Sequence, residues 1–238
     1  MNCRTLLVLI AAAAFTGCFF PNAIVQGSEE TVVATSTETG FTGVSVENAC
    51  EATITRGDAY SVSIEINENI ESHLDIENSN GTLYISLDDN HIYNNLTFKV
   101  TITMPGLERV SGSGASEIEM SGFDSDGPLS VDLSGASELA GDIGCTDAAF
   151  ELSGASTVAI SGSADDITCN ASGASTLDLR DFTCVDADID LSGASDMRVN
   201  ASGTIGGDLS GASEVYYYGS PTVGTFDVSG ASEVKKAN

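Results

Sequence analysis

Repeated serine is the feature of this chain that most suggests chemistry. The tetrapeptide Ser-Gly-Ala-Ser begins at Ser113, Ser134, Ser153, Ser172, Ser192, Ser210 and Ser229. A serine acts as a nucleophile when a general base such as histidine lies within hydrogen-bonding reach. The only two histidines, His73 and His91, lie outside the repeats, and the G-x-S-x-G nucleophile motif is absent from the sequence. We therefore predict that these serines form a structural ladder of hydrogen bonds along a backbone bend and are not catalytic.

Carboxylates are the second group of side chains that could take part in catalysis or binding. A pair of them could act as general acid and base in a polysaccharide-acting enzyme, and carboxylates stacked about 4.8 Å apart could bind calcium. Each acid of the repeats, however, recurs at the same position, so no pair is singled out as catalytic. The nonapeptide of calcium-loaded β-rolls has a partial match at Gly206-Gly207-Asp208. We predict no catalytic residue, no metal site and no cofactor, and we keep the enzyme and the calcium-binding structural protein as alternatives.

The excess of acidic residues restricts the partners. The chain has 35 Asp and Glu residues against 8 Lys and Arg residues, and its formal net charge is −27. Such a surface repels nucleic acid, so we expect no nucleic-acid partner. It favours solubility and is compatible with cations or cationic partners.

Cysteine chemistry is limited to four residues. Of the six cysteines, one lies in the expected signal peptide and one is the expected lipidation site, which leaves Cys50, Cys145, Cys169 and Cys184. An even number of cysteines in an exported protein permits disulfides, and the pairing stays open. One pair is disfavoured, because Cys145 and Cys184 occupy the same repeat position two coils apart, roughly 9 to 10 Å from each other. Cys169 falls at an apolar repeat position and is expected in the core.

The tyrosines Tyr216, Tyr217 and Tyr218 form the one aromatic cluster of the repeats. Their register places Tyr217 at a buried apolar position, whereas Tyr216 and Tyr218 face outward. Outward tyrosines could stack on a sugar or on a protein partner, so these two are candidate ligand-binding residues. The alternative is that they shield the terminal coil.

The spacing of the tetrapeptides determines the elements that position these residues. Successive tetrapeptides are 21, 19, 19, 20, 18 and 19 residues apart. The residue before the tetrapeptide is apolar at Leu133, Leu152, Ala171, Leu191, Leu209 and Val228. The second residue after it is apolar at Ile118, Leu139, Val158, Leu177, Met197, Val215 and Val234. This period of two on each side of a tight bend indicates two short strands per repeat, each with one buried face.

Strands this short, repeated without hairpin signals, pair best with their counterparts one repeat away. The sequence therefore predicts an all-β fold, a single-stranded parallel β-helix with about 19 residues per coil. Because crossovers between parallel strands are right-handed as a rule, we expect a right-handed helix. Glycine at the corner supplies backbone angles that other residues avoid, and alanine lets successive coils approach closely.

The N-terminus has the features of an export signal. Arg4 precedes an apolar run that is too short to span a bilayer, and Phe15-Thr16-Gly17-Cys18 resembles the lipobox of bacterial lipoproteins. We predict a lipoprotein signal peptide over residues 1–17 and lipidation of Cys18. Residues 18–40 are rich in Thr, Ser, Glu, Gly and Ala without a sustained period, which indicates a flexible spacer.

The remaining chain divides into two parts. Residues 41–110 contain alternating segments separated by turn signals such as Asn80-Gly81, and they predict an N-terminal β segment or cap. Residues 111–238 contain the β-helix repeats with Ser-Gly-Ala-Ser corners. A cap is needed because the first coil otherwise exposes unpaired backbone groups.

Four runs in this order resemble the autotransporter adhesin head GIN domain family of bacteria. They are Arg56-Gly57-Asp58 followed by Tyr60-Ser61-Val62-Ser63-Ile64, then Asn80-Gly81-Thr82-Leu83-Tyr84-Ile85, Thr101-Ile102-Thr103-Met104-Pro105-Gly106-Leu107 and Val110-Ser111-Gly112-Ser113-Gly114-Ala115. The resemblance extends from about Phe41 to Val234. It implies an exported β-helical protein, often a lipoprotein, and it brings no catalytic residues.

These features together predict a non-enzymatic cell-envelope lipoprotein whose β-helical surface serves binding or adhesion. Its expected partners are the membrane, through the lipid anchor, and a glycan or protein ligand. We expect it at the outer membrane, facing either the periplasm or the exterior.

Overall fold

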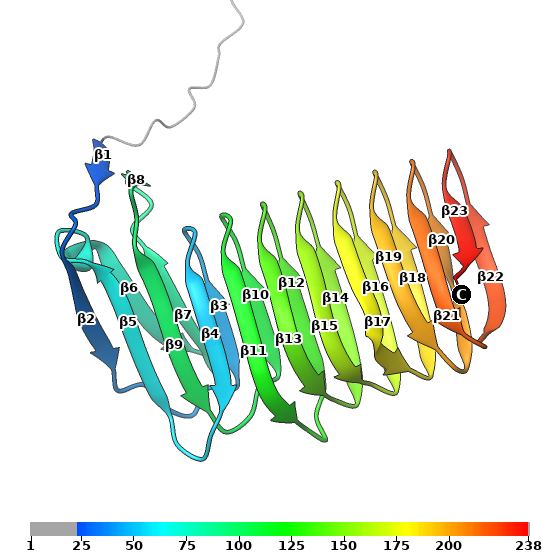
Figure 1. Ribbon diagram of the computed structural model, residues 1–238, viewed down its shortest axis with the longest axis horizontal. Helices are drawn as coiled ribbons and strands as arrows, with labels where there is room; N and C mark the ends of the chain where they lie inside the picture. The colour runs from blue at the N-terminus through cyan, green and yellow to red at the C-terminus, as the bar shows by residue number, and fades with distance from the viewer. Residues whose placement is uncertain (1–22, 238) are drawn as a thin grey trace, which may run out of the picture.

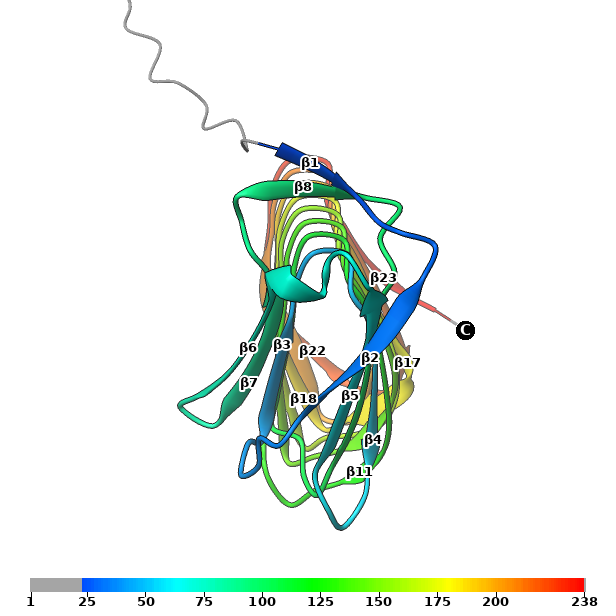
Figure 2. The same ribbon diagram turned by 90° about the vertical axis from the view of Figure 1, so that its left-hand side faces the viewer.

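The computed structural model describes residues 23–237, which form a flattened β-solenoid of about six turns with about 20 residues per turn (Figure 1). Two large sheets face each other, and the core lies between them (Figure 2). Seen from its N-terminal end, the chain ascends one sheet, crosses the upper corner and descends the other while moving away from the viewer. The predicted right-handed parallel β-helix is therefore confirmed.

The first large sheet has ten strands, which lead from the N-terminal edge to the C-terminal edge. In spatial order they are β6 (Leu74–Ser79), β7 (Thr82–Leu87), β3 (Gly43–Val46), β10 (Arg109–Gly112), β12 (Leu129–Leu133), β14 (Asp147–Leu152), β16 (Asp166–Ala171), β18 (Asp186–Leu191), β20 (Thr204–Leu209) and β22 (Thr222–Val228). All neighbours in this sheet are parallel except β6 and β7.

The second large sheet has eleven strands, which likewise lead from the N-terminal edge to the C-terminal edge. In spatial order they are β2 (Thr31–Ser36), β5 (Ser61–Asn67), β9 (Phe98–Met104), β4 (Glu51–Arg56), β11 (Glu117–Asp124), β13 (Glu138–Gly144), β15 (Thr157–Ser163), β17 (Thr176–Cys184), β19 (Asp196–Ala201), β21 (Glu214–Gly219) and β23 (Glu233–Lys236). The strands β2, β5 and β9 pair antiparallel, and the others pair parallel.

The register between coils follows the sequence repeat. Leu133 of β12 pairs with Leu152 of β14, and Leu152 pairs with Ala171 of β16. All three side chains are buried, and the residues beside them along each strand are exposed. The predicted inward columns are thus confirmed, because residues at the same distance from the tetrapeptide lie next to one another in adjacent coils.

The corner serines form the predicted ladder. The last serine of each tetrapeptide is buried. In the first six tetrapeptides its hydroxyl donates to the carbonyl of the first serine, as Ser156 does to Ser153 at 2.8 Å and Ser175 to Ser172 at 2.9 Å. The same hydroxyl can also accept across coils, since the N–H of Ser116 donates to Oγ of Ser137 at 3.3 Å. These hydroxyls satisfy backbone groups at the bend, which is a structural role.

The corner glycines allow the coils to stack. Gly173 has a φ of +83°, and a Cβ built on it would clash with the backbone carbonyl of Gly154 in the preceding coil. The N–H of Ala174 donates to that same carbonyl at 2.7 Å. Glycine therefore meets two requirements here, a left-handed backbone and close approach between coils.

The N-terminal cap differs from the predicted spacer. The flexible spacer expected over residues 18–40 is wrong for the part that the structure describes as strands, namely β1 (Ala23–Gln26) and β2. The strand β2 pairs antiparallel with β5, and its Val32 and Ala34 pack against the core. This pairing covers the edge of β5, and such coverage is a tertiary effect that composition alone does not reveal.

The upper part of the cap holds a small two-stranded sheet. The strand β1 pairs parallel with β8 (His91–Asn94), and the 3-10 turn η1 (Glu71–His73) lies between β5 and β6 (Figure 2). These segments lie outside the regular coils, and they bring together the two histidines of the chain.

Candidate functional site

The ten-stranded sheet carries a shallow groove of about 530 Å³ beside the serine corners. It crosses five coils, and its polar lining consists of one acidic column and one serine column. The acidic column comprises Asp132, Glu151, Asn170, Asp190 and Asp208, and the serine column comprises Ser153, Ser172, Ser192 and Ser210. We call this surface the acidic groove.

The parallel register positions the acidic column. Each member pairs with the equivalent residue of the next strand, so the side chains project from the same face about 4.8 Å apart. All five side chains are exposed. One internal contact orders them, because the N–H of Asp208 donates to Oδ1 of Asp190 at 3.0 Å. The groove therefore offers a row of hydrogen-bond acceptors to an extended ligand.

A second acidic column lies on the eleven-stranded sheet, on the other side of the corner. The strand register aligns the first residue after each tetrapeptide into this column. Its members are Glu117, Glu138, Thr157, Thr176, Asp196, Glu214 and Glu233. This column supplies a matched surface against which a role of the acidic groove can be tested.

The tyrosine cluster lies on β21, near the C-terminal end. Tyr217 pairs with the buried Val199 and packs against the core, as its register predicted. Tyr216 and Tyr218 are half-buried. The hydroxyl of Tyr216 donates to Glu214 at 2.7 Å, and its ring has Lys235 5.5 Å from the centroid. The hydrogen bond to Glu214 raises the pKa of Tyr216. The ligand-binding role of Tyr216 and Tyr218 stays a prediction.

The four cysteines that the structure describes are free thiols. Burial raises the pKa of Cys50 and of Cys169 to about 12, so these thiols are protonated and unreactive at neutral pH. Cys169 lies in the core, as predicted. The expected lipidation site, Cys18, lies outside the described residues.

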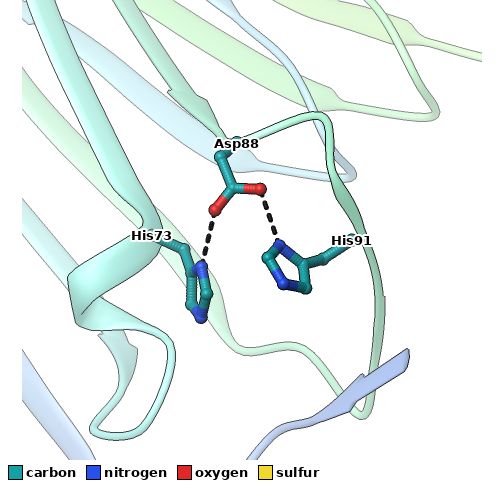
Figure 3. A group of neighbouring side chains, drawn as sticks. All are labelled: His73, Asp88 and His91. Atoms are coloured by element: carbon teal, nitrogen blue, oxygen red, sulfur yellow. Dashed lines mark hydrogen bonds and ion pairs between the residues drawn. The ribbon is translucent and has the colours of Figure 1, made fainter. Parts of the chain in front are cut away.

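The cap contains a cluster that the sequence analysis missed. The carboxylate of Asp88 accepts a hydrogen bond from Nδ1 of His73 at 2.6 Å and another from Nδ1 of His91 at 2.7 Å (Figure 3). The two imidazole rings meet edge to face with their centroids 4.6 Å apart. One ligand atom from each of the three side chains lies within 4.8 Å of the other two, so the group could hold a metal ion.

Three separate segments position this cluster. His73 ends η1, Asp88 directly follows β7, and His91 begins β8. The N–H of Asp88 donates to the carbonyl of His73 at 3.0 Å, and the hydroxyl of Tyr93 donates to the carbonyl of Asp88 at 3.2 Å. The only available sequence signal was that both histidines of the chain flank one hairpin, and this signal carries no information about distance.

The electrostatics of the cluster keep Asp88 ionised. The hydrogen bonds from His91 and then from His73 hold the pKa of Asp88 well below its usual value. Burial raises the pKa of Tyr93 to about 12, so its hydroxyl remains a donor. The cluster is therefore a fixed carboxylate shared by two imidazole N–H groups.

Comparison with known proteins identifies a family and several solved structures that match most of the chain. Residues 40–221 match the family described as “Putative auto-transporter adhesin, head GIN domain”. No curated protein matches the chain. Among residues 23–237, no helix is long and apolar enough to cross a membrane.

Solved structures of bacterial proteins share the fold. A “putative adhesin” from Bacteroides fragilis superposes with a TM-score of 0.83 at 19% identity and covers 90% of this chain and 100% of that chain. A “putative lipid binding protein” from Parabacteroides distasonis has a TM-score of 0.72 at 15% identity, with coverages of 90% and 99%. A “putative adhesin” from Parabacteroides merdae has a TM-score of 0.70 at 15% identity, with the same coverages.

Proposed function

Since the chain belongs to the auto-transporter adhesin head GIN domain family, we propose that it is an exported, non-enzymatic protein of the bacterial cell envelope that binds a ligand through its β-solenoid surface. The family and two of the three structural neighbours described above carry the name of adhesins, and the third that of a lipid binding protein, which favours a surface-binding role. The solenoid supports the same role, because it repeats one set of side chains over many coils and thus matches an extended ligand.

The acidic groove is the observation that carries the proposal. Its carboxylates accept hydrogen bonds but donate none, and the serine hydroxyls beside them can do both. The ligand we propose is an extended glycan or protein segment with many hydroxyl, amide or basic groups. Nucleic acid and other polyanions do not fit, because the acidic column repels them.

A pair of matched variants tests this assignment. The groove variant is Asp132→Asn, Glu151→Gln, Asp190→Asn and Asp208→Asn together. The control removes four exposed charges from the other sheet by Glu117→Gln, Glu119→Gln, Glu138→Gln and Asp196→Asn together. We expect purified wild type and control to retain binding to a glycan and matrix-protein array, and the groove variant to lose it. Equal binding by the two variants would refute the role of the groove.

The tyrosines Tyr216 and Tyr218 form a second proposed contact with the ligand. Tyrosine offers a flat apolar ring together with a polar edge, which suits sugar or protein recognition. The variant Tyr216→Ala, Tyr218→Ala is measured on the same array. Unchanged glycan and matrix binding would show that these residues only shield the last coil.

The proposal includes a lipid anchor at Cys18 that holds the domain at the outer membrane. Its support is the lipobox-like Phe15-Thr16-Gly17-Cys18 after a short apolar run. Cells that express Cys18→Ala should release the protein into the soluble fraction, whereas wild type stays with membranes. Protease shaving of intact cells separates the two orientations, since a surface-facing domain is cleaved and a periplasmic domain is protected.

The absence of enzymatic activity is part of the proposal. Its support is the repetition of the acidic columns, which gives no carboxylate pair a distinct environment. Incubation of purified protein with acidic polysaccharides should yield no new reducing ends or unsaturated products. Turnover of any of them would overturn this part.

A further inference from the structure

We propose that His73, Asp88 and His91 form a binding site for a divalent transition-metal ion, represented by Zn²⁺, with Nδ1 of each histidine and a carboxylate oxygen of Asp88 as its protein ligands. The site lies in the cap and not in the acidic groove. The proposal of this metal site is therefore independent of the proposed binding function, and either can fail without the other.

The three ligand atoms are already close to the arrangement that an ion requires. They lie within 4.8 Å of one another. Nδ1 of His73 is 2.6 Å from Oδ2 of Asp88, and Nδ1 of His91 is 2.7 Å from Oδ1. A tetrahedral zinc ion with bonds of about 2.0 to 2.2 Å places its ligand atoms about 3.3 to 3.5 Å apart. Each imidazole nitrogen therefore has to withdraw by less than about 1 Å from the carboxylate oxygen that it now contacts.

The protons of the cluster occupy the place of the ion. An ionised carboxylate only accepts hydrogen bonds, so both Nδ1 atoms must carry the proton in the bonds to Asp88. When the ion binds, each Nδ1 proton passes to Nε2 of the same ring or to water, and the freed lone pair binds the ion. One divalent ion thus takes the place of two protons that now lie between the two imidazole nitrogens and the two carboxylate oxygens.

The chemistry of the ligands selects the class of ion. Imidazole favours zinc, copper, nickel and iron, whereas calcium and magnesium favour sites made of oxygen atoms alone. The net charge of −27 raises the local concentration of cations around the chain. The side chains of His73, His91 and Asp88 are 23%, 25% and 32% exposed, which leaves a path for the ion and room for water ligands.

The backbone around the cluster is held before any ion arrives. The hydrogen bonds from the N–H of Asp88 to the carbonyl of His73 and from Tyr93 to the carbonyl of Asp88 join η1, the end of β7 and β8. Since β8 carries β1 as its only partner strand in the described part of the chain, an ion here would fasten the outermost sheet of the cap. Zinc at about 100 times its Kd should raise the Tm by about 5 to 10 °C.

The decisive experiment follows the imidazole nitrogens by NMR while ZnCl₂ is added to purified, chelator-treated protein. The chain has two histidines, so its imidazole signals are few and assignable. We expect one equivalent of zinc to bind, and both Nδ1 atoms to lose the signature of a protonated nitrogen. Calcium at about 1 mM should neither reproduce nor prevent this change.

Variants measure the contribution of each ligand by calorimetric titration with zinc. The changes His73→Gln, His91→Gln and Asp88→Asn should each weaken zinc binding about 10-fold or more. The matched control Asp89→Asn removes the neighbouring exposed carboxylate and should leave the affinity within about threefold. Circular dichroism checks that each variant remains folded.

Three results would overturn the proposal. The first is the absence of zinc binding by wild type up to about 1 mM. The second is binding that leaves both imidazole spectra unchanged, because the ion would then sit elsewhere. The third is wild-type affinity in the folded double variant His73→Gln, His91→Gln.

Discussion

Replacing one corner glycine by alanine tests whether the repeat stacks through its backbone. Gly173 lies in a central corner with a φ of +83°, and a Cβ there meets the carbonyl of Gly154. The left-handed backbone costs alanine about 1 to 2 kcal/mol. Displacement of the coil weakens the hydrogen bond from Ala174 to Gly154, which contributes about 0.5 to 1.5 kcal/mol. We expect Gly173→Ala to lower the free energy of unfolding by about 3 kcal/mol.

Gly81 provides the matched control for this experiment. It has a φ of +78°, and no heavy atom lies within 4 Å of a Cβ built on it. Gly81→Ala therefore incurs the backbone strain without the clash, and should cost about 1 to 2 kcal/mol. Urea unfolding followed by circular dichroism measures both variants. Equal destabilisation of the two within about 0.5 kcal/mol would refute the stacking argument, because strain alone would then explain both results.

Three further predictions concern a buried corner serine, the buried thiols and the loss of stability at low pH. Ser175→Ala removes the buried hydroxyl that donates to Ser172 and should cost about 1 to 3 kcal/mol in urea unfolding, whereas Ser172→Ala, on the exposed side, should change stability by less than about 0.5 kcal/mol. Cys50 and Cys169, whose pKa burial raises to about 12, should resist alkylation at about pH 8 until the protein is unfolded; rapid labelling of native protein would contradict their placement. Hydrogen bonds from Arg180 lower the pKa of Asp178, so this pair stabilises the fold above the unfolded-state pKa of about 3.9 and loses its effect as pH falls through the lower folded pKa. Asp178→Asn should therefore lose less stability than wild type between about pH 5 and pH 2, and parallel losses would refute this contribution.

The regular coils could be predicted because their information is local and repeated. An apolar residue before each tetrapeptide and another two residues after it define the buried faces. Residues at the same distance from the tetrapeptide then become neighbours, so Asp132 and Glu151, each two residues before a tetrapeptide, could be placed in one column without knowledge of the structure. The same register predicted that Tyr217 packs inward and that Cys169 lies in the core.

The cap could not be predicted to the same depth. The strands β1 and β2 lie in a segment whose composition resembles a spacer, and they become strands through pairing with β8 and β5. The residues that pair with β2 lie more than 25 positions further along the chain, as Asn67 does opposite Thr31. Nothing in the local pattern specifies such pairing, because it depends on which edge of the first coil is left uncovered.

The sequence by itself determined the repeating architecture, the inward and outward columns and the structural role of the serine corners, because the recurring tetrapeptide gives every coil the same neighbours on each side of its bend. Only the tertiary structure decided where the two histidines meet. His73 and His91 lie on different irregular segments, and the distance between their rings depends on how η1, β7 and β8 close over the first coil. The acidic groove follows from repetition, whereas the histidine–aspartate cluster follows from closure of the cap.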